Sequence, residues 1–202
     1  MIIIEALKKI IKNEKTIMEY DNVTDISDVN TIQFGSFFQK NDSTKDEIEW
    51  LLLSKTEKNI LLLSKYVLEY KKFNENSEYI EIRDTTLYRW LWNDFLNEAF
   101  SEDEQEFIGN ITCPSLKDIK EYFNISSPLE STNEILKAYV TDYAKAHSDD
   151  YSIKDYGTWW LADNGWQNNC ALFVEKDGRI PKNGAYVDFC FGVRPIILLD
   201  LK

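Results

Sequence analysis

The sequence predicts an α+β domain built on a twisted, mostly antiparallel sheet with helices packed against it. Strand-like apolar segments come first, between residues 31 and 64, and helix-like segments fill the chain from residue 84 to 146. Strand-like segments return between residues 157 and 201. Because strands and helices are grouped instead of alternating, an α+β arrangement is favoured over a parallel α/β one. The chain of 202 residues, 44% of them hydrophobic, is long enough to bury its own core.

The beginning of the chain predicts an amphipathic helix over residues 2–20, followed by a polar linker over residues 21–30. Its apolar residues recur at helical spacing: Ile3, Leu7, Ile10, Ile11 and Met18. The expected organisation is therefore residues 1–30 for helix and linker, and residues 31–202 for a single α+β domain. A helix with an apolar face must lie on something, so we expect residues 2–20 to dock on a partner or on a second copy in a homodimer.

Strands are expected at both ends of the domain. The first group is Thr31–Phe38, Ile48–Leu53 and Asn59–Ser64, of which the last two form a hairpin. The second group is Gly157–Leu161, Cys170–Lys176, Arg179–Ile180, Ala185–Phe191 and Arg194–Leu201. Asp177-Gly178 is a hairpin turn signal within it. Alternation over residues 185–191 predicts a common face for Ala185, Val187, Phe189 and Phe191.

Four helices are expected in the middle of the chain. The first begins at Asp84 or Thr85, either of which can cap it, and ends near Phe100. The others are a short helix opened by a capping box at residues 101–104, one from Ser115 to about Phe123, and one over residues 132–146. The single histidine, His147, then follows the end of a helix, where a cation is favoured by the helix dipole.

The charge balance excludes several classes of partner. The chain has 23 Lys and Arg against 35 Asp and Glu, a net charge of −12, and no basic run longer than a pair. Nucleic acid and anionic membrane surfaces both require a basic patch, so neither is expected as a partner. No apolar stretch reaches the length of a membrane-spanning helix.

The numbers and spacing of histidine and cysteine limit the metal sites and redox motifs that the chain can form. One histidine excludes a multi-histidine metal site, and the three cysteines contain no CxxC pair. An odd number of cysteines without a secretory signal indicates reduced thiols, so a cytoplasmic location is expected. No two carboxylates are forced together in an apolar setting, so the sequence assigns no catalytic residue and no metal ligand.

Seven short motifs follow one another along the chain. They are Ile32-Gln33-Phe34-Gly35-Ser36-Phe37-Phe38-Gln39, Ile48-Glu49-Trp50, Leu61-Leu62-Leu63-Ser64-Lys65, Thr86-Leu87-Tyr88-Arg89-Trp90-Leu91, Thr141-Asp142-Tyr143-Ala144, Trp159-Trp160-Leu161 and Gly192-Val193-Arg194-Pro195. In this order they resemble a bacterial family of uncharacterised domains. The resemblance extends over about residues 31–200. The family has no known activity to carry over to this chain.

The closing motifs also resemble, more distantly, C-type-lectin-like domains and formylglycine-generating enzymes. This resemblance implies a C-type-lectin-like fold, but fold alone does not supply function. Two positions depart from the pattern of the uncharacterised family. Ala162 stands where its members usually have Arg, and Trp92 where they usually have Asn.

The loop over residues 162–169 is the candidate ligand-binding site. It is rich in side-chain oxygen, carries an aromatic residue and follows the Trp159-Trp160-Leu161 segment. The candidate ligand-binding residues are Asp163, Asn164, Trp166, Gln167 and Asn168. The simpler alternative is an ordinary polar loop with a turn at residues 163–165. As a binding site, it is expected to take a small molecule, a glycan or a protein, with calcium as a less favoured ligand and no other cofactor.

Five other residues are assigned structural roles: Arg89, Trp90, Trp159, Trp160 and Arg194. A buried arginine needs a carboxylate or carbonyl partner, and Asp84 and Asp188 are candidates for Arg194. Trp92-Asn93-Asp94 mimics a calcium motif of sugar-binding lectins but falls within a helix, so no metal is assigned there.

Three functions remain open at this stage. A non-catalytic binding module that uses the loop over residues 162–169 is preferred, so an enzyme is not favoured. The second is a structural or assembly domain that docks through residues 2–20. The third is an oxygenase related to formylglycine-generating enzymes, which use a cysteine pair only a few residues apart to bind copper. Cys170 and Cys190 are 20 positions apart, which argues against it.

Overall fold

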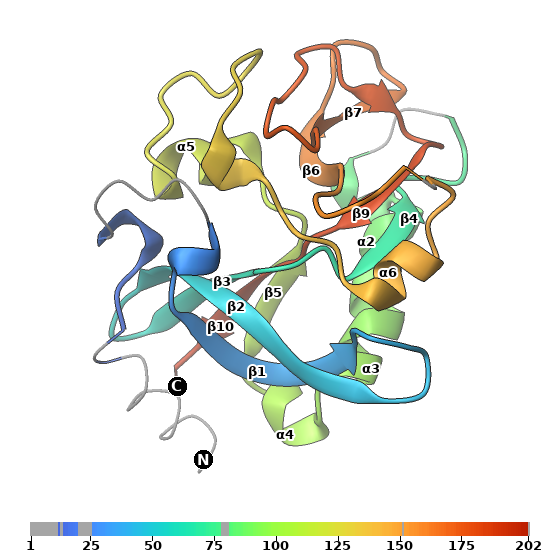
Figure 1. Cartoon of the computed structure of the whole chain (residues 1–202). Helices are drawn as coiled ribbons and strands as arrows, with labels where there is room; N and C mark the ends of the chain where they lie inside the picture. The colour runs from blue at the N-terminus through green and yellow to red at the C-terminus, as the bar shows by residue number, and fades with distance from the viewer. Residues whose placement is uncertain (1–11, 13, 20–25, 78–80, 151, 202) are drawn as a thin grey trace.

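The computed structural model describes residues 12, 14–19, 26–77, 81–150 and 152–201, and these form two five-stranded sheets with short helices around them (Figure 1). The strands of the first sheet are, in spatial order, β1 (Thr31–Phe38), β2 (Lys45–Lys55), β3 (Asn59–Ser64), β10 (Ile196–Asp200) and β5 (Ile108–Thr112). Those of the second are β4 (Glu69–Lys72), β9 (Cys190–Val193), β6 (Trp159–Asn164), β7 (Cys170–Val174) and β8 (Ala185–Tyr186).

The strand pairing confirms the predicted α+β class with mainly antiparallel strands. β1, β2 and β3 follow one another as antiparallel neighbours, including the predicted β2–β3 hairpin. The last strand, β10, then inserts between β3 and β5, so that Ile197 lies opposite both Leu62 and Ile111. Among the strands of the described residues, β6 and β9 form the one parallel pair.

The long central helix consists of α2 (Thr86–Trp90), a π-helical segment (Leu91–Phe95) and α3 (Leu96–Ala99). Thr85 caps it, because its hydroxyl accepts a hydrogen bond from the backbone N of Tyr88. The predicted capping box at Ser101 is confirmed at the start of α4 (Glu102–Gln105), and a second capping box, at Ser115, opens α5 (Leu116–Tyr122) where a helix was predicted to begin. The remaining helices are α6 (Asp142–Ala146) and the 3-10 segments Ile17–Glu19, Ile26–Asp28, Ile82–Asp84 and Glu134–Leu136.

Buried tryptophans join the two sheets to one another and to the loops. Trp159 and Trp160 are fully buried neighbours on β6, and they point into two different apolar clusters. The indole N–H of Trp160 donates to the carbonyl oxygen of Lys71 on β4, and that of Trp159 donates to the carbonyl oxygen of Leu136. Each large apolar side chain therefore also satisfies a backbone acceptor in the interior.

The helix predicted over residues 132–146 is wrong. Only Glu134–Leu136 and Asp142–Ala146 are helical, and Val140 between them forms a parallel bridge with Val67. The backbone N of Val67 donates to the carbonyl oxygen of Tyr139. These tertiary hydrogen bonds replace the helical ones, and the helix restarts where Thr141 caps α6. His147 follows the end of α6, as predicted.

The C-terminal strands differ from the prediction in three places. The strand predicted over residues 185–191 is interrupted, because β8 ends at Tyr186 and Phe189 is exposed in the turn before β9. The predicted turn at residues 177–178 is present, but Arg179–Ile180 is not a strand, and Ile180 forms only an isolated bridge. β6 begins at Trp159 and continues to Asn164, so the first three residues of the predicted loop are strand.

The predicted helix over residues 2–20 lies largely outside the described residues, as does the first half of the predicted linker. Within the described part, Ile17 is buried, whereas Met18, which was expected on the apolar face, is exposed. Ile26 and Val29 are also buried, so these two side chains pack on the domain. None of the helices in the described part of the chain combines the length and apolar character needed to cross a membrane.

Candidate functional site

The turn between β6 and β7 is fastened tightly to a second segment of the chain. The backbone N of Gly165 donates to the carbonyl oxygen of Cys170, and the backbone N of Trp166 donates to that of Asn183. A Cβ atom at Gly165 would lie 2.4 Å from the Asn183 oxygen. Only glycine therefore permits this close approach, which fixes where the Trp166 side chain emerges.

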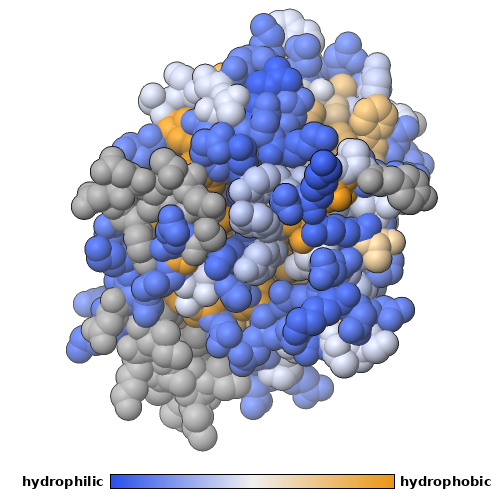
Figure 2. Space-filling model, viewed as in Figure 1, coloured by the Kyte–Doolittle hydropathy of each residue, from blue (hydrophilic) through white to orange (hydrophobic). Residues whose placement is uncertain are grey.

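A hollow of about 540 Å³ opens beside this turn. We call it the β7–β8 hollow. Trp166 and Gln167 line one side, and Asn183, Tyr186 and Phe189 line another. Trp166 is 80% exposed, Tyr186 47% and Phe189 48%, so three large aromatic side chains lie in solvent around one cavity. Figure 2 shows apolar surface at the upper right, over the β7 end of the second sheet.

Two of the three exposed rings, those of Tyr186 and Phe189, are the outer end of a continuous aromatic chain. The ring centroids of Tyr186 and Phe189 are 5.8 Å apart, and those of Phe189 and Phe191 are 6.0 Å apart. Phe191 in turn lies 4.6 Å from the buried Trp160. The backbone N of Phe189 donates to the carbonyl oxygen of Tyr186, which closes the turn that carries Phe189 outward. The aromatic surface is thus held in place by the core behind it.

None of the described side chains that line the β7–β8 hollow carries a formal charge at neutral pH. Its polar side chains include the amides of Gln167 and Asn183 and the thiol of Cys170. Burial raises the pKa of the Cys170 thiol, so it remains protonated. Such a surface offers ring faces and amide donors and acceptors, which suit a neutral ligand with an apolar face and hydroxyl groups.

The structure brings two of the five predicted loop residues, Trp166 and Gln167, to this cavity. Asp163 faces elsewhere: its Oδ2 accepts a hydrogen bond of 2.5 Å from the backbone N of Leu116, at the start of α5. Burial raises the pKa of the Asp163 carboxyl. Asn164 and Asn168 are exposed and do not line the hollow.

For calcium, the less favoured ligand of this loop, the one carboxylate among the five candidate residues is already engaged. Asp163, the only carboxylate among them, acts as a helix cap. Within the residues that the structure describes, no three His, Cys, Asp or Glu side chains are grouped so that they could hold a metal ion.

The two predicted structural arginines have very different environments. Arg194 is fully buried, and its Nε donates to the carbonyl oxygen of Ser64 at 2.8 Å. The expected partners Asp84 and Asp188 are wrong: both are exposed, and the Nη atoms of Arg194 have no hydrogen-bond partner among the described residues. Arg89 is exposed and donates to the backbone carbonyls of Asp84 and Thr85.

The cysteines give no support to copper chemistry. Cys170 lies on β7 and Cys190 on β9, and β6 separates these strands. All three cysteines are free thiols, and burial raises the pKa of each, to about 12 for Cys113. Protonated thiols are poor metal ligands.

Asn183, Tyr186 and Phe189 belong to the cavity but were not predicted as site residues. The predicted strand over residues 185–191 placed Phe189 with its buried neighbours, so its exposure was hidden. The available signal was Asn183-Gly184, a turn dipeptide immediately before the strand. The hydrogen bond that draws Asn183 to Trp166 depends on tertiary structure and has no sequence signature.

Comparison with known proteins identifies a family whose description names no activity. No curated protein and no solved structure matches the chain. A family profile matches residues 57–201, which include β3 to β10 and both sides of the β7–β8 hollow, but neither of the first two motifs. The predicted membership of an uncharacterised family is confirmed: the chain belongs to the family described as Domain of unknown function (DUF6273).

Proposed function

We propose that this protein is a non-catalytic binding module whose ligand occupies the β7–β8 hollow. The observation that carries the proposal is the group of three exposed aromatic side chains, Trp166, Tyr186 and Phe189, around one cavity. The volume of about 540 Å³ is in the range of small-molecule sites. Exposed Trp and Tyr side chains are the residues that most often dominate binding energies.

A pyranose ring of a neutral glycan is the ligand class that best fits this surface. The C–H face of such a ring packs on an aromatic side chain, and its hydroxyl groups pair with amides such as Gln167 and Asn183. The absence of charged groups among the described lining residues favours it over a nucleotide or an amino acid. A C-type-lectin-like fold remains part of this proposal, and the three free thiols support a reducing, cytoplasmic setting.

The test is a titration of the ¹⁵N-labelled protein with maltose, cellobiose and lactose. The chain has six tryptophans, so six indole N–H signals report on it, and Trp166→Phe assigns the one of interest. We expect a saturable shift of the Trp166 signal by at least one disaccharide. Trp166→Ala should weaken that binding at least tenfold without lowering the free energy of unfolding, because the side chain is exposed.

The matched control is Met18→Ala, which removes another exposed apolar side chain that does not line the cavity. It should leave the affinity unchanged. If none of the three disaccharides moves the Trp166 signal, the glycan assignment is wrong. Docking through residues 2–20 remains a separate proposal, tested by whether deletion of residues 1–22 changes the mass measured by light scattering.

A further inference from the structure

A second hollow, of about 440 Å³, lies where β1, β4, the central helix and α6 meet. We call it the Glu69 hollow. It shares no lining residue with the β7–β8 hollow. Its composition is also different, because aromatic rings are here combined with carboxylates, chiefly Glu69, Asp94 and Glu98.

The apolar wall of the Glu69 hollow is a continuous series of aromatic rings. The centroids of Trp90 and Phe95 are 5.5 Å apart, those of Phe95 and Phe37 are 5.0 Å apart, and those of Phe37 and Tyr143 are 5.8 Å apart. Phe38 stacks on Tyr143 at 5.3 Å. Phe37 and Phe95 are buried, so the wall is anchored in the core.

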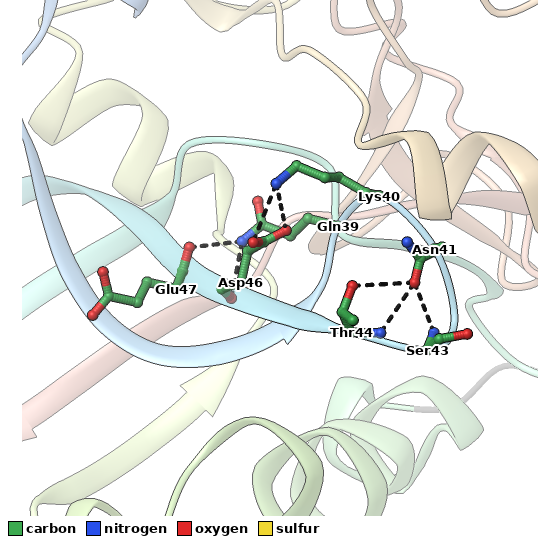
Figure 3. Close-up of polar contacts among 7 residues, drawn as sticks. All are labelled: Gln39, Lys40, Asn41, Ser43, Thr44, Asp46 and Glu47. Atoms are coloured by element: carbon green, nitrogen blue, oxygen red, sulfur yellow. Dashed lines mark hydrogen bonds and ion pairs between the residues drawn. The ribbon is translucent and has the colours of Figure 1, made fainter.

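The β1–β2 turn holds the Phe38 end of this wall in place. The side-chain amide of Gln39 donates to the carbonyl oxygens of Asp46 and Glu47, at 3.2 and 2.7 Å (Figure 3). The carbonyl oxygen of Gln39 accepts from the backbone N of Tyr143 at 2.9 Å. The turn is therefore tied to α6, and the ring of Tyr143 is fixed opposite Phe38.

A buried carboxylate lies among these rings with acceptor capacity to spare. Glu69 is 5% exposed; its Oε1 accepts from the backbone N of Tyr70 at 2.9 Å, and its Oε2 from the hydroxyl of Tyr143 at 3.3 Å. Burial, with the nearby Glu69, raises the pKa of Tyr143 to about 12, so this hydroxyl remains a donor. A carboxylate has about four acceptor positions, and the described residues use two of those of Glu69.

The chain already places its own ammonium groups on this surface. The Nζ of Lys71 lies 5.2 Å from the ring centroid of Trp90 and 3.9 Å from a carboxylate oxygen of Glu69. At the edge of the hollow, the Nζ of Lys45 lies 5.4 Å from the ring centroid of Phe38 and 2.6 Å from a carboxylate oxygen of Glu98, although Lys45 is not itself a lining residue. Aromatic faces and carboxylates both attract cations, so the hollow favours a primary ammonium group at these positions.

We propose that the Glu69 hollow binds the primary alkylammonium group of a ligand. The ammonium group lies between the ring of Trp90 and the Glu69 carboxylate, and its alkyl chain packs on the wall. The Lys71 side chain is displaced from this position into solvent. It can move there because it is already 38% exposed. Lys71 is thus an internal competitor. The net charge of −12 also attracts cationic ligands.

The test uses n-butylammonium chloride at pH 7.5 with the ¹⁵N-labelled protein. The indole N–H signal of Trp90, assigned with Trp90→Phe, reports on this hollow, and the signal of Trp166 reports on the other. We expect the Trp90 signal to shift saturably, with a dissociation constant in the millimolar range, and the Trp166 signal not to shift. n-Butanol, which has the same chain without the charge, should shift the Trp90 signal at least tenfold less effectively.

Two substitutions are expected to move the affinity in opposite directions. Glu69→Gln should weaken n-butylammonium binding at least tenfold, because the buried charge is removed. Lys71→Met should tighten it about threefold, because the internal competitor is lost. Glu57→Gln, an exposed position in the β2–β3 turn, removes the same charge outside the hollow and should change nothing.

The proposal is overturned if the Trp90 signal does not saturate, or if n-butanol is as effective as the ammonium ion. It is also overturned if Lys71→Met fails to tighten binding, and this holds even if Glu69→Gln does not fold. Cadaverine and Nα-acetyl-lysine methylamide then distinguish the source of the ammonium group, as a free polyamine or a lysine of a peptide. Because the signals of Trp90 and Trp166 are separate, this result is independent of the glycan test.

Discussion

Replacing Arg194 with Met should reveal a titration that is hidden in the core. The Arg194 guanidinium is fully buried and 5.0 Å from the Trp159 ring, and its one hydrogen bond among the described residues runs from Nε to the Ser64 oxygen. Burial lowers the pKa of Arg194 to about 9. Met keeps an apolar chain of similar length, so it removes the charge while leaving little empty space.

The size of the effect follows from proton linkage. Above pH 9 the folded state releases the proton of Arg194, whereas the unfolded chain, in which arginine has its ordinary high pKa, keeps it. The unfolded state then binds more protons, so stability increases with pH. The free energy of unfolding of the wild type should therefore rise relative to that of Arg194→Met, by about 1.4 kcal/mol between pH 7 and pH 10.

The assay is urea unfolding, followed by tryptophan fluorescence, at pH 7, 8, 9 and 10 for both proteins. Burial also raises the pKa values of groups such as Tyr143 and Cys113, which both proteins contain. Their contributions to the pH dependence therefore cancel in the difference between the two free energies of unfolding. Arg194→Ala provides the packing control and should be about 2–4 kcal/mol less stable than Arg194→Met, because it leaves a cavity. A difference between wild type and Arg194→Met that stays flat from pH 7 to pH 10 would refute the reasoning, since the guanidinium would then remain charged.

Two further substitutions test how the elements around the site are held. Asp163→Ala should lower the free energy of unfolding by about 1 kcal/mol in urea unfolding, because α5 loses the acceptor for the Leu116 backbone N. An unchanged free energy of unfolding would show that the hydrogen bond from the Leu116 backbone N to Asp163 does not stabilise α5. Gly178→Ala should cost more, about 2 kcal/mol or above in the same assay, because φ is +85° and a Cβ would lie 2.1 Å from the Asn133 oxygen. A loss below 1 kcal/mol would mean that this turn adapts easily.

Local sequence signals predicted much of the fold. The bounds of β1 and β3 were predicted to the residue, because each is a short apolar run between turn-forming or polar segments. The start of α5 was predicted at Ser115 and that of α2 at Asp84 or Thr85, and the side chains of Thr85 and Ser115 accept hydrogen bonds from backbone N–H groups within four residues of themselves. Interactions over such a short range depend on residues that are neighbours in the sequence, so they can be predicted from a single sequence.

The errors fall where distant segments decide the conformation. Residues 138–141 lost their predicted helix to hydrogen bonds with Val67 and Asp155, which no helical spacing in the sequence could reveal. The alternation over residues 185–191 was a genuine strand pattern, yet Val187 is the one buried residue of this segment, and its backbone N donates to the Asn169 oxygen between β8 and β9. The next residues turn outward, and this places Phe189 in solvent instead of in the core.

The two proposed sites depend differently on the part of the chain that the family shares. Both sides of the β7–β8 hollow, from Trp166 to Phe191, lie within the matched residues 57–201. The Glu69 hollow takes Phe37 and Phe38 from β1, which lies before the match begins. A chain that matches this family but has no strand equivalent to β1 would lack two of the five rings of that aromatic wall. The alkylammonium site is therefore a property of this chain with its first strand, whereas the β7–β8 hollow is formed entirely within the family domain.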